Sequence, residues 1–86
     1  MIQRFQQYID GTFEDGGASF DSVDPSSGKV WARMPRASAT DVDRAVRAAH
    51  RAFHAPEWAG LTATQRGKLL ARLADLVAAQ ASHLAQ

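Results

Sequence analysis

The stretch SVDPSSGKVW, residues 22–31, carries a strong turn signal between two strands of this chain. Its centre looks like the end of a phosphate-binding loop, which requires the pattern G-x-x-x-x-G-K-[ST]. The residue five positions before Gly28 is Val23 rather than glycine, and Val30, which has no hydroxyl, follows Lys29. The phosphate-binding interpretation therefore fails at two required positions.

The same stretch is well suited to a structural turn. Pro25 fixes φ near the start, and Gly28 can adopt a left-handed conformation at the end. On the N-terminal side, alternating residues predict a strand with Phe20 and Val23 buried. On the C-terminal side, residues 29–34 are predicted to form a strand that Pro35 should end.

A second hairpin is predicted before this one. Asp10-Gly11 separates Tyr8-Ile9 from Thr12-Phe13, and Asp-Gly between short apolar arms favours a type I′ turn. Another turn follows at residues 14–17. Residues 1–35 are therefore expected to form short antiparallel strands and turns.

The rest of the chain has helical periodicity. Ser38 and Asp41 form a capping box that starts a helix over residues 38–55, and Thr40 with Asp43 fits the same template. We favour Ser38, which places two acids in the first turn, where the helix dipole stabilises them. The predicted core face consists of Val42, Ala45, Val46, Ala49, Ala52 and Phe53.

A second helix is predicted over residues 62–86, after a linker. Thr62 and Gln65 form its capping box. A wide apolar stripe follows at helical spacing, made of Leu69, Leu70, Leu73, Leu76, Val77 and Leu84. Two helices after short antiparallel strands give an expected α+β fragment.

The composition excludes several classes of function. The chain has 86 residues, a net charge of +1 and no cysteine. A nearly neutral chain offers no strong basic field for nucleic acid, and the lack of cysteine excludes disulfides and thiolate sites. No apolar run is long enough to span a membrane, and the start lacks the apolar region of a secretory signal. We expect a soluble, cytoplasmic chain.

His50 and His54 lie four residues apart, a spacing that can hold zinc. The position of the glutamate in the protease motif is Arg51, whose positive charge disfavours a metal, and no third ligand is apparent. We expect a solvated helix end. Similarly, Arg44, Arg47 and Arg51 are expected to form a solvated face, with Asp43 paired to Arg47 at i, i+4. Trp31 and Trp58 are expected to serve in packing.

Four pieces together resemble the N-terminal segment of the NAD(P)-dependent aldehyde dehydrogenase superfamily. They are YIDGTF (8–13), FDSVDPSSGKVWARMPRAS (20–38), DVDRAVRAAHRAF (41–53) and EWAGLTATQRGKLLARLADLV (57–77). Each motif is weak alone, but their order and spacing cover nearly the whole chain. In this resemblance, DPSSG is the structural turn between two early strands.

The resemblance implies an α/β parent with a Rossmann-like cofactor domain, in which a cysteine thiolate attacks an aldehyde and hydride passes to NAD(P). Neither a catalytic nor a cofactor-binding residue of that scheme can be assigned here, because the cysteine, glutamate and cofactor loop have no counterparts in residues 1–86. One position is carried over: main-chain oxygens of the segment at Ser22 and Val23 help to bind a monovalent cation in some members.

These observations lead to a first hypothesis of a truncated aldehyde dehydrogenase without a complete domain, inactive alone and binding neither NAD nor NADP. Its expected partner is the remainder of that domain or a second copy, with no nucleic acid and no membrane. The alternative is a free-standing interaction module that docks through its leucine-rich helix face. A small nucleic-acid binder that uses the arginine face is the weakest hypothesis.

Overall fold

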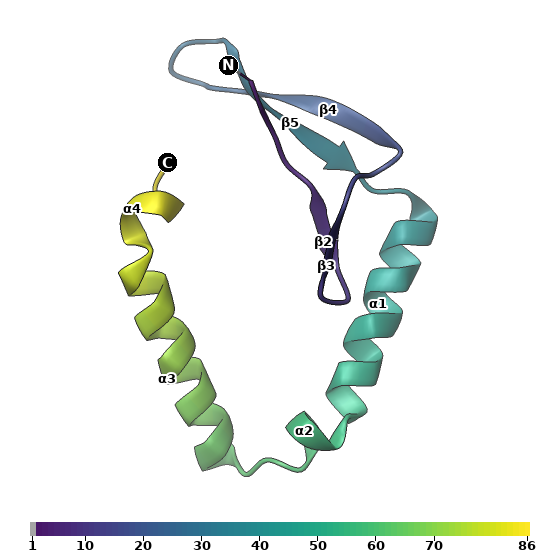
Figure 1. Ribbon diagram of the computed structural model, residues 1–86, viewed down its shortest axis with the longest axis vertical. Helices are drawn as coiled ribbons and strands as arrows, with labels where there is room; N and C mark the ends of the chain where they lie inside the picture. The colour runs from purple at the N-terminus through teal and green to yellow at the C-terminus, as the bar shows by residue number, and fades with distance from the viewer. Residues whose placement is uncertain (1) are drawn as a thin grey trace. The chain divides into compact units, whose positions relative to one another are not determined.

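The computed structural model describes residues 2–86, so Met1, the first residue of the predicted strand region, lies outside the described residues. Short strands come first and helices follow (Figure 1), which confirms the predicted α+β class. The described residues divide into two compact units, with the boundary in the chain between Arg51 and Ala52, and each unit is described by itself. The strands of the first unit are β1 (Gln3–Arg4), β2 (Gln7–Ile9), β3 (Thr12–Glu14), β4 (Ala18–Val23) and β5 (Val30–Arg36).

The β2–β3 hairpin confirms the predicted Asp-Gly turn. Asp10 and Gly11 have φ values of 52° and 79°, the positive angles that a type I′ turn requires at both central positions. Ile9 pairs with Thr12 across the turn. The rings of Tyr8 and Phe13 lie 4.8 Å apart, edge to face, on the paired strands.

The β4–β5 connection confirms the predicted turn at residues 24–28. Gly28 has a φ of 71°, and its N–H donates to the Asp24 carbonyl at 2.8 Å. The Asp24 carboxylate accepts from the Ser26 N–H at 2.8 Å and the Ser27 hydroxyl at 3.1 Å. These bonds lower the pKa of Asp24, the Ser26 N–H contributing most. The polar atoms of this turn are therefore satisfied by hydrogen bonds within the turn.

Two details of the predicted strands were wrong. The first is the end of β5, which continues through Pro35 to Arg36. Pro35 pairs with Ser19 on β4, whereas β1 on the other side reaches only Ala32 and Arg33. Proline is tolerated there because β5 has an open edge beyond β1, where no N–H is required.

The second error concerns strand direction. The sheet has the order β1-β5-β4, and β1 runs parallel to β5 rather than antiparallel. A tight turn forces antiparallel pairing, but β1 and β5 are separated by all the other strands, and so long a connection allows parallel pairing. Sequence patterns of single strands carry no information on this choice.

The helices are α1 (Ala39–His54), α2 (Pro56–Ala59), α3 (Ala63–Ala79) and α4 (Ala81–Leu84). Ser38 caps α1 as favoured: its hydroxyl accepts from the Asp41 N–H, and the Asp41 carboxylate accepts from the Ser38 N–H, both at 3.0 Å. The Thr62 capping box is also formed. The short α2 occupies the predicted linker, where Pro56 is suited to the first helical turn.

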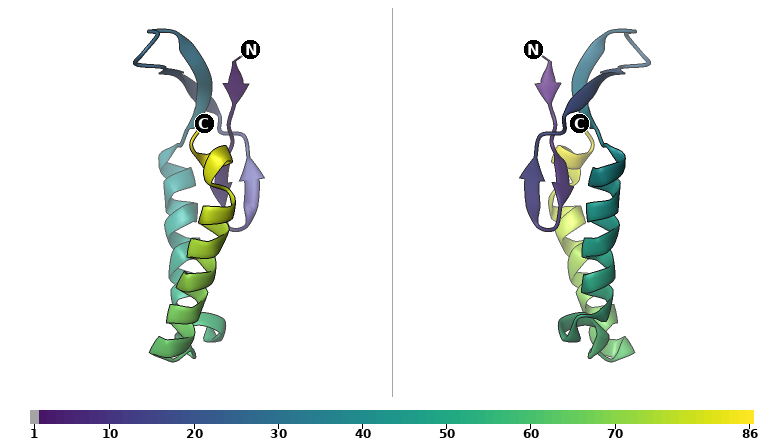
Figure 2. Two further views of the ribbon diagram at one scale, coloured as in Figure 1. Left: turned by 90° about the vertical axis from the view of Figure 1, so that its left-hand side faces the viewer. Right: turned by 90° about the vertical axis from the view of Figure 1, so that its right-hand side faces the viewer.

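The single helix predicted over residues 62–86 is instead interrupted at Gln80 (Figure 2), where φ is −104° and ψ is 16°. The Gln80 N–H is shared between the carbonyls of Leu76 and Val77 at 3.1 Å each. Such sharing tightens the last turn of a helix and ends its regular ladder. No glycine or proline marks this break, so the sequence pattern did not reveal it.

The largest difference between the structure and the sequence-based expectation is the low burial of the hydrophobic side chains. Among the hydrophobic residues described, only Ile9 and Ala32 are buried. Apart from the half-buried Ala45, the positions predicted as core are exposed, from Phe20 at 44% and Val23 at 52% to Val46 at 61% and Leu73 at 56%. The periodicity predicted the apolar faces correctly, but nothing in the described residues of either unit covers them.

Candidate functional site

The most highly connected polar cluster ties the β2–β3 hairpin to α1. Arg44 on α1 forms an ion pair with Glu14 on β3 and another with Asp41 at 2.8 Å. Gln7 on β2 donates from Nε2 to Glu14 at 2.9 Å. Figures 1 and 2 both show the hairpin beside α1. One guanidinium thus joins two elements that lie about thirty positions apart.

The electrostatics of this cluster disfavour general acid–base chemistry near neutral pH. The pKa of Asp41 is strongly lowered, first by the Ser38 N–H and then by Arg44. The pKa of Glu14 is lowered mainly by Arg44, and the pKa of Arg44 is raised by the two carboxylates. A general acid or base needs a pKa near the working pH, and these groups are shifted away from it. The cluster is therefore a structural connection.

A second connection lies further along α1. Arg51 contacts Asp10 in the hairpin turn at 2.9 Å, and the predicted pair of Arg47 with Asp43 forms at 2.8 Å. Sequence reasoning had placed all three arginines on a solvated face and missed the two hairpin contacts. The available signal was the spacing of Arg44 and Arg51, which are two helical turns apart and share one face.

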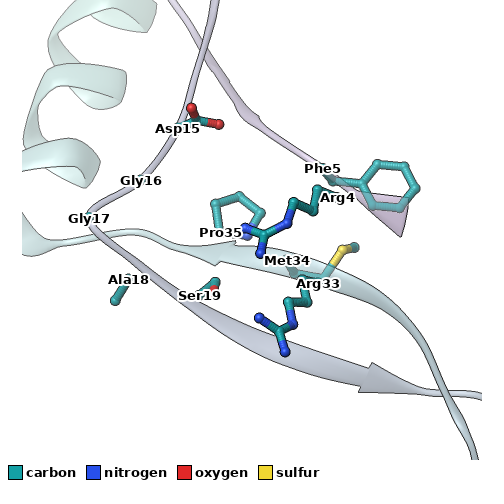
Figure 3. Close-up of a pocket in the computed structure, with 10 residues that line it drawn as sticks. All are labelled: Arg4, Phe5, Asp15, Gly16, Gly17, Ala18, Ser19, Arg33, Met34 and Pro35. Atoms are coloured by element: carbon teal, nitrogen blue, oxygen red, sulfur yellow. The ribbon is translucent and has the colours of Figure 1, made fainter. Parts of the chain in front are cut away.

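A cavity of 330 Å³ lies between β1, the segment before β4, and β5 (Figure 3). Arg4 and Arg33 extend into this space from neighbouring strands, and the backbone of Gly16 and Gly17 borders it. Sequence reasoning did not predict this site, because β1 is too short to show a pattern and its partner is distant in sequence. The full lining is Arg4, Phe5, Asp15, Gly16, Gly17, Ala18, Ser19, Arg33, Met34 and Pro35.

The predicted cation position lies at the end of β4. The pairing register shifts between Ser22 and Val23, which opposes Val30 on β5. The Ser22 hydroxyl accepts from Trp31 Nε1 at 3.0 Å, and the Trp31 ring lies 5.8 Å from that of Phe5. Trp31 thus makes an aromatic contact, but it is 38% exposed rather than packed in a core. The role of the Val23 carbonyl toward a cation stays a prediction.

The two histidines both lie on α1. The rings of Phe53 and His54 stand 5.1 Å apart and at right angles, and His50 also has an interaction partner. Within residues 2–86, no three or more histidine, aspartate or glutamate side chains are grouped closely enough to hold a metal ion. The structure therefore supplies no additional ligand for a site at His50 and His54.

In the second unit, Trp58 and Arg66 form the most specific contact. The Arg66 guanidinium lies 5.0 Å from the centre of the Trp58 ring, and its Nη2 donates to the Trp58 carbonyl at 3.3 Å. This contact joins α2 to α3 and gives Trp58 the packing role expected of it.

The family model of the aldehyde dehydrogenase family matches residues 13–86 of this chain. The chain belongs to the aldehyde dehydrogenase family. The matched range includes both the β4–β5 turn and all of the helices, which confirms the family resemblance drawn from the four sequence motifs.

Individual aldehyde dehydrogenases agree with this assignment. The chain is 57% identical over 84 residues to (Z)-2-((N-methylformamido)methylene)-5-hydroxybutyrolactone dehydrogenase of Acinetobacter baylyi, covering 98% of this chain and 17% of the relative. It is 42% identical over 82 residues to cytosolic 10-formyltetrahydrofolate dehydrogenase of Xenopus laevis, covering 93% and 9%. The crystal structure of an NAD-dependent aldehyde dehydrogenase from Sinorhizobium meliloti superposes with a TM-score of 0.81 at 37% identity, covering 93% of this chain and 16% of that one.

The chain thus spans about a sixth or less of the length of these dehydrogenases. It corresponds to the N-terminal segment of a larger aldehyde dehydrogenase. No helix in residues 2–86 combines the length and apolar character needed to cross a membrane.

Proposed function

We propose that residues 1–86 form the leading scaffold of an aldehyde dehydrogenase domain whose remainder performs NAD(P)-dependent oxidation of an aldehyde to a carboxylic acid. The observation that carries this proposal is the exposed apolar face of α3. Its leucines are about half exposed, from 47% for Leu69 to 61% for Leu70. Burying one leucine is worth roughly 1.5–3 kcal/mol, so a face of this width strongly favours a covering partner.

In this proposal the chain contributes positioning rather than chemistry. A thiolate nucleophile is impossible here because the sequence has no cysteine. NAD or NADP, the aldehyde, and the residues that act on them belong to the remainder of the domain. The chain by itself is expected to bind neither cofactor and to catalyse no oxidation. Because the chemistry draws on the soluble NAD(P) pool, a cytoplasmic location is part of the proposal.

Complementation provides the test. The chain is mixed with an aldehyde dehydrogenase relative from which the matching N-terminal segment has been removed, and reduction of NAD and NADP is followed by absorbance over a panel of aldehydes. We expect turnover only when both pieces are present. The Acinetobacter baylyi relative is a suitable source because it is 57% identical in the matched segment.

Two variants sharpen this experiment. Leu73→Asp places a charge in the middle of the leucine face and should abolish complementation. Ala71→Asp adds the same charge two residues away, on another side of α3, and should retain most of it. Turnover by the repurified chain alone, or equal loss with both variants, would contradict the scaffold proposal.

Within the assembled domain, we also propose that the main-chain carbonyl of Val23 is a ligand of a monovalent cation. The family resemblance supports this role, as does the irregular strand pairing between Ser22 and Val23. The test compares the thermal stability of the complemented enzyme in potassium, sodium and tetramethylammonium chloride at equal ionic strength. Identical melting temperatures in the three salts would refute the site.

The alternative function is a free-standing interaction module, and the same exposed α3 face favours it. The two proposals differ in what the isolated chain should do. A module should be a monomer with a sharp, cooperative melting transition, because it must fold without the remainder of a catalytic domain. A scaffold segment should melt broadly or self-associate, and should gain cooperativity when the rest of the dehydrogenase is added.

A further inference from the structure

Two arginines stand next to each other on adjacent strands. In the parallel β1–β5 ladder, Arg4 pairs directly with Arg33. Residues opposite one another in a ladder project from the same face of the sheet, and like charges in that position destabilise the pairing. This arrangement therefore requires compensation by negative charge.

The described residues compensate only one of the two charges. Asp21 on β4 reaches Arg33 Nε at 3.3 Å. The Arg4 side chain has neither an ion pair nor a hydrogen bond to any residue in the range 2–86. The Arg4 side chain nevertheless lines the 330 Å³ cavity, together with Arg33 (Figure 3).

The opposite wall of the cavity also carries donors. Gly16 and Gly17 form it, and their backbone N–H groups find no acceptor in the described part of the chain. Gly16 lies tight against β5, since a Cβ built on it would come within 3.4 Å of Pro35. The Ser19 hydroxyl adds a further donor to the lining.

One carboxylate, Asp15, also borders the cavity. It accepts a hydrogen bond from Gln6 Nε2 at 3.2 Å, so part of its hydrogen-bonding capacity is already used. Since Arg33 is already paired with Asp21, the Arg4 guanidinium is the positive group of the lining without an ion-pair partner in residues 2–86. The unpaired Arg4 guanidinium, with the unused N–H groups of Gly16 and Gly17, favours an anion.

We propose that this cavity binds an oxyanion group, a carboxylate or a phosphate, between Arg4, Arg33 and the Gly16–Gly17 backbone. Guanidinium groups match both anions because their planar N–H fork donates two parallel hydrogen bonds. The group has two possible sources: a small anionic ligand, or an acidic side chain of the remaining dehydrogenase. The site itself does not depend on the dehydrogenase proposal, because all of its residues belong to this chain.

The first experiment titrates inorganic phosphate and acetate into the full chain, at constant ionic strength, and follows the backbone amide signals of Gly16 and Gly17 by nuclear magnetic resonance. We expect saturable shifts of both signals. Arg4→Gln should weaken binding at least tenfold, whereas Lys29→Gln, which removes one positive charge from the β4–β5 turn, should leave it unchanged. Asp15→Asn removes the opposing charge and should tighten binding.

The second experiment separates the two sources. The remainder of a relative, lacking its N-terminal segment, is added to the phosphate-saturated chain. Displacement of phosphate identifies an acidic side chain of the dehydrogenase as the occupant, and retention identifies a small ligand. The proposal is overturned if neither anion shifts the glycine signals, or if Lys29→Gln weakens binding as much as Arg4→Gln. Should Arg4→Gln fail to fold, Asp15→Asn decides the matter, since unchanged or weaker binding by that variant also overturns the proposal.

Discussion

Gly28 shows how a single backbone angle supports the hairpin that joins β4 to β5. Its φ of 71° lies in the left-handed region, which costs residues with a side chain about 1–2 kcal/mol. We predict that Gly28→Ala lowers the hydrogen-exchange protection of the Asp24 amide, which bonds the Lys29 carbonyl, by about 5- to 30-fold. Gly17→Ala is the matched control, because a Cβ there meets nothing within 4 Å. Equal effects of the two variants would show that the turn does not depend on the angle.

The connection between the hairpin and α1 has a predictable response to acid. The pKa values of Asp41 and Glu14 are lowered in the folded chain, so their stabilising contribution is complete above the unfolded values of about 4. It is lost as the pH falls through the lowered folded values. We predict that carbon-detected titration gives Asp41 a pKa below that of an unfolded aspartate, and that Arg44→Gln moves it upward. An unchanged Asp41 value in Arg44→Gln would contradict the role of the ion pair.

At the scale of elements, the capping boxes decide where the helices begin. The Thr62 hydroxyl accepts from the Gln65 N–H at 3.2 Å, and Gln65 Oε1 accepts from the Thr62 N–H at 2.8 Å. Loss of such a cap costs about 0.5–2 kcal/mol. We predict that Thr62→Ala reduces helicity by circular dichroism, while Thr64→Ala, two residues inside the same helix, preserves or slightly increases it. A loss with Thr64→Ala as large as with Thr62→Ala would argue against the cap.

Elements also show where sequence patterns stop being informative. The Asp-Gly turn, the β4–β5 turn and both favoured capping boxes could be predicted because each depends on residues within five positions of one another. The parallel partner of β5, the continuation of β5 through Pro35 and the cavity beside Arg4 could not. Each of these depends on which strand lies next to β5, and that choice involves β1, nearly thirty residues away.

For the whole molecule, the exposed face of α3 is the dominant physical property. Several half-exposed leucines forfeit stabilisation comparable to the entire stability of a small domain. We predict that the isolated chain self-associates, that Leu73→Asp reduces this association in light scattering, and that Ala71→Asp does so much less. A monomeric parent chain with a sharp thermal transition would contradict the prediction and favour the independent module.

The sequence by itself determined the Asp-Gly and β4–β5 turns, the starts of α1 and α3, the apolar faces and, through the order of its motifs, the family. These features follow from short-range sterics, hydrogen bonding and periodicity. Only the tertiary structure decided that β1 joins the sheet in parallel, that Arg44 and Arg51 hold the hairpin, and that Arg4 and Arg33 share a cavity. It also showed that the apolar faces stay uncovered within each unit, because periodicity identifies a face that favours burial but not whether anything is present to bury it.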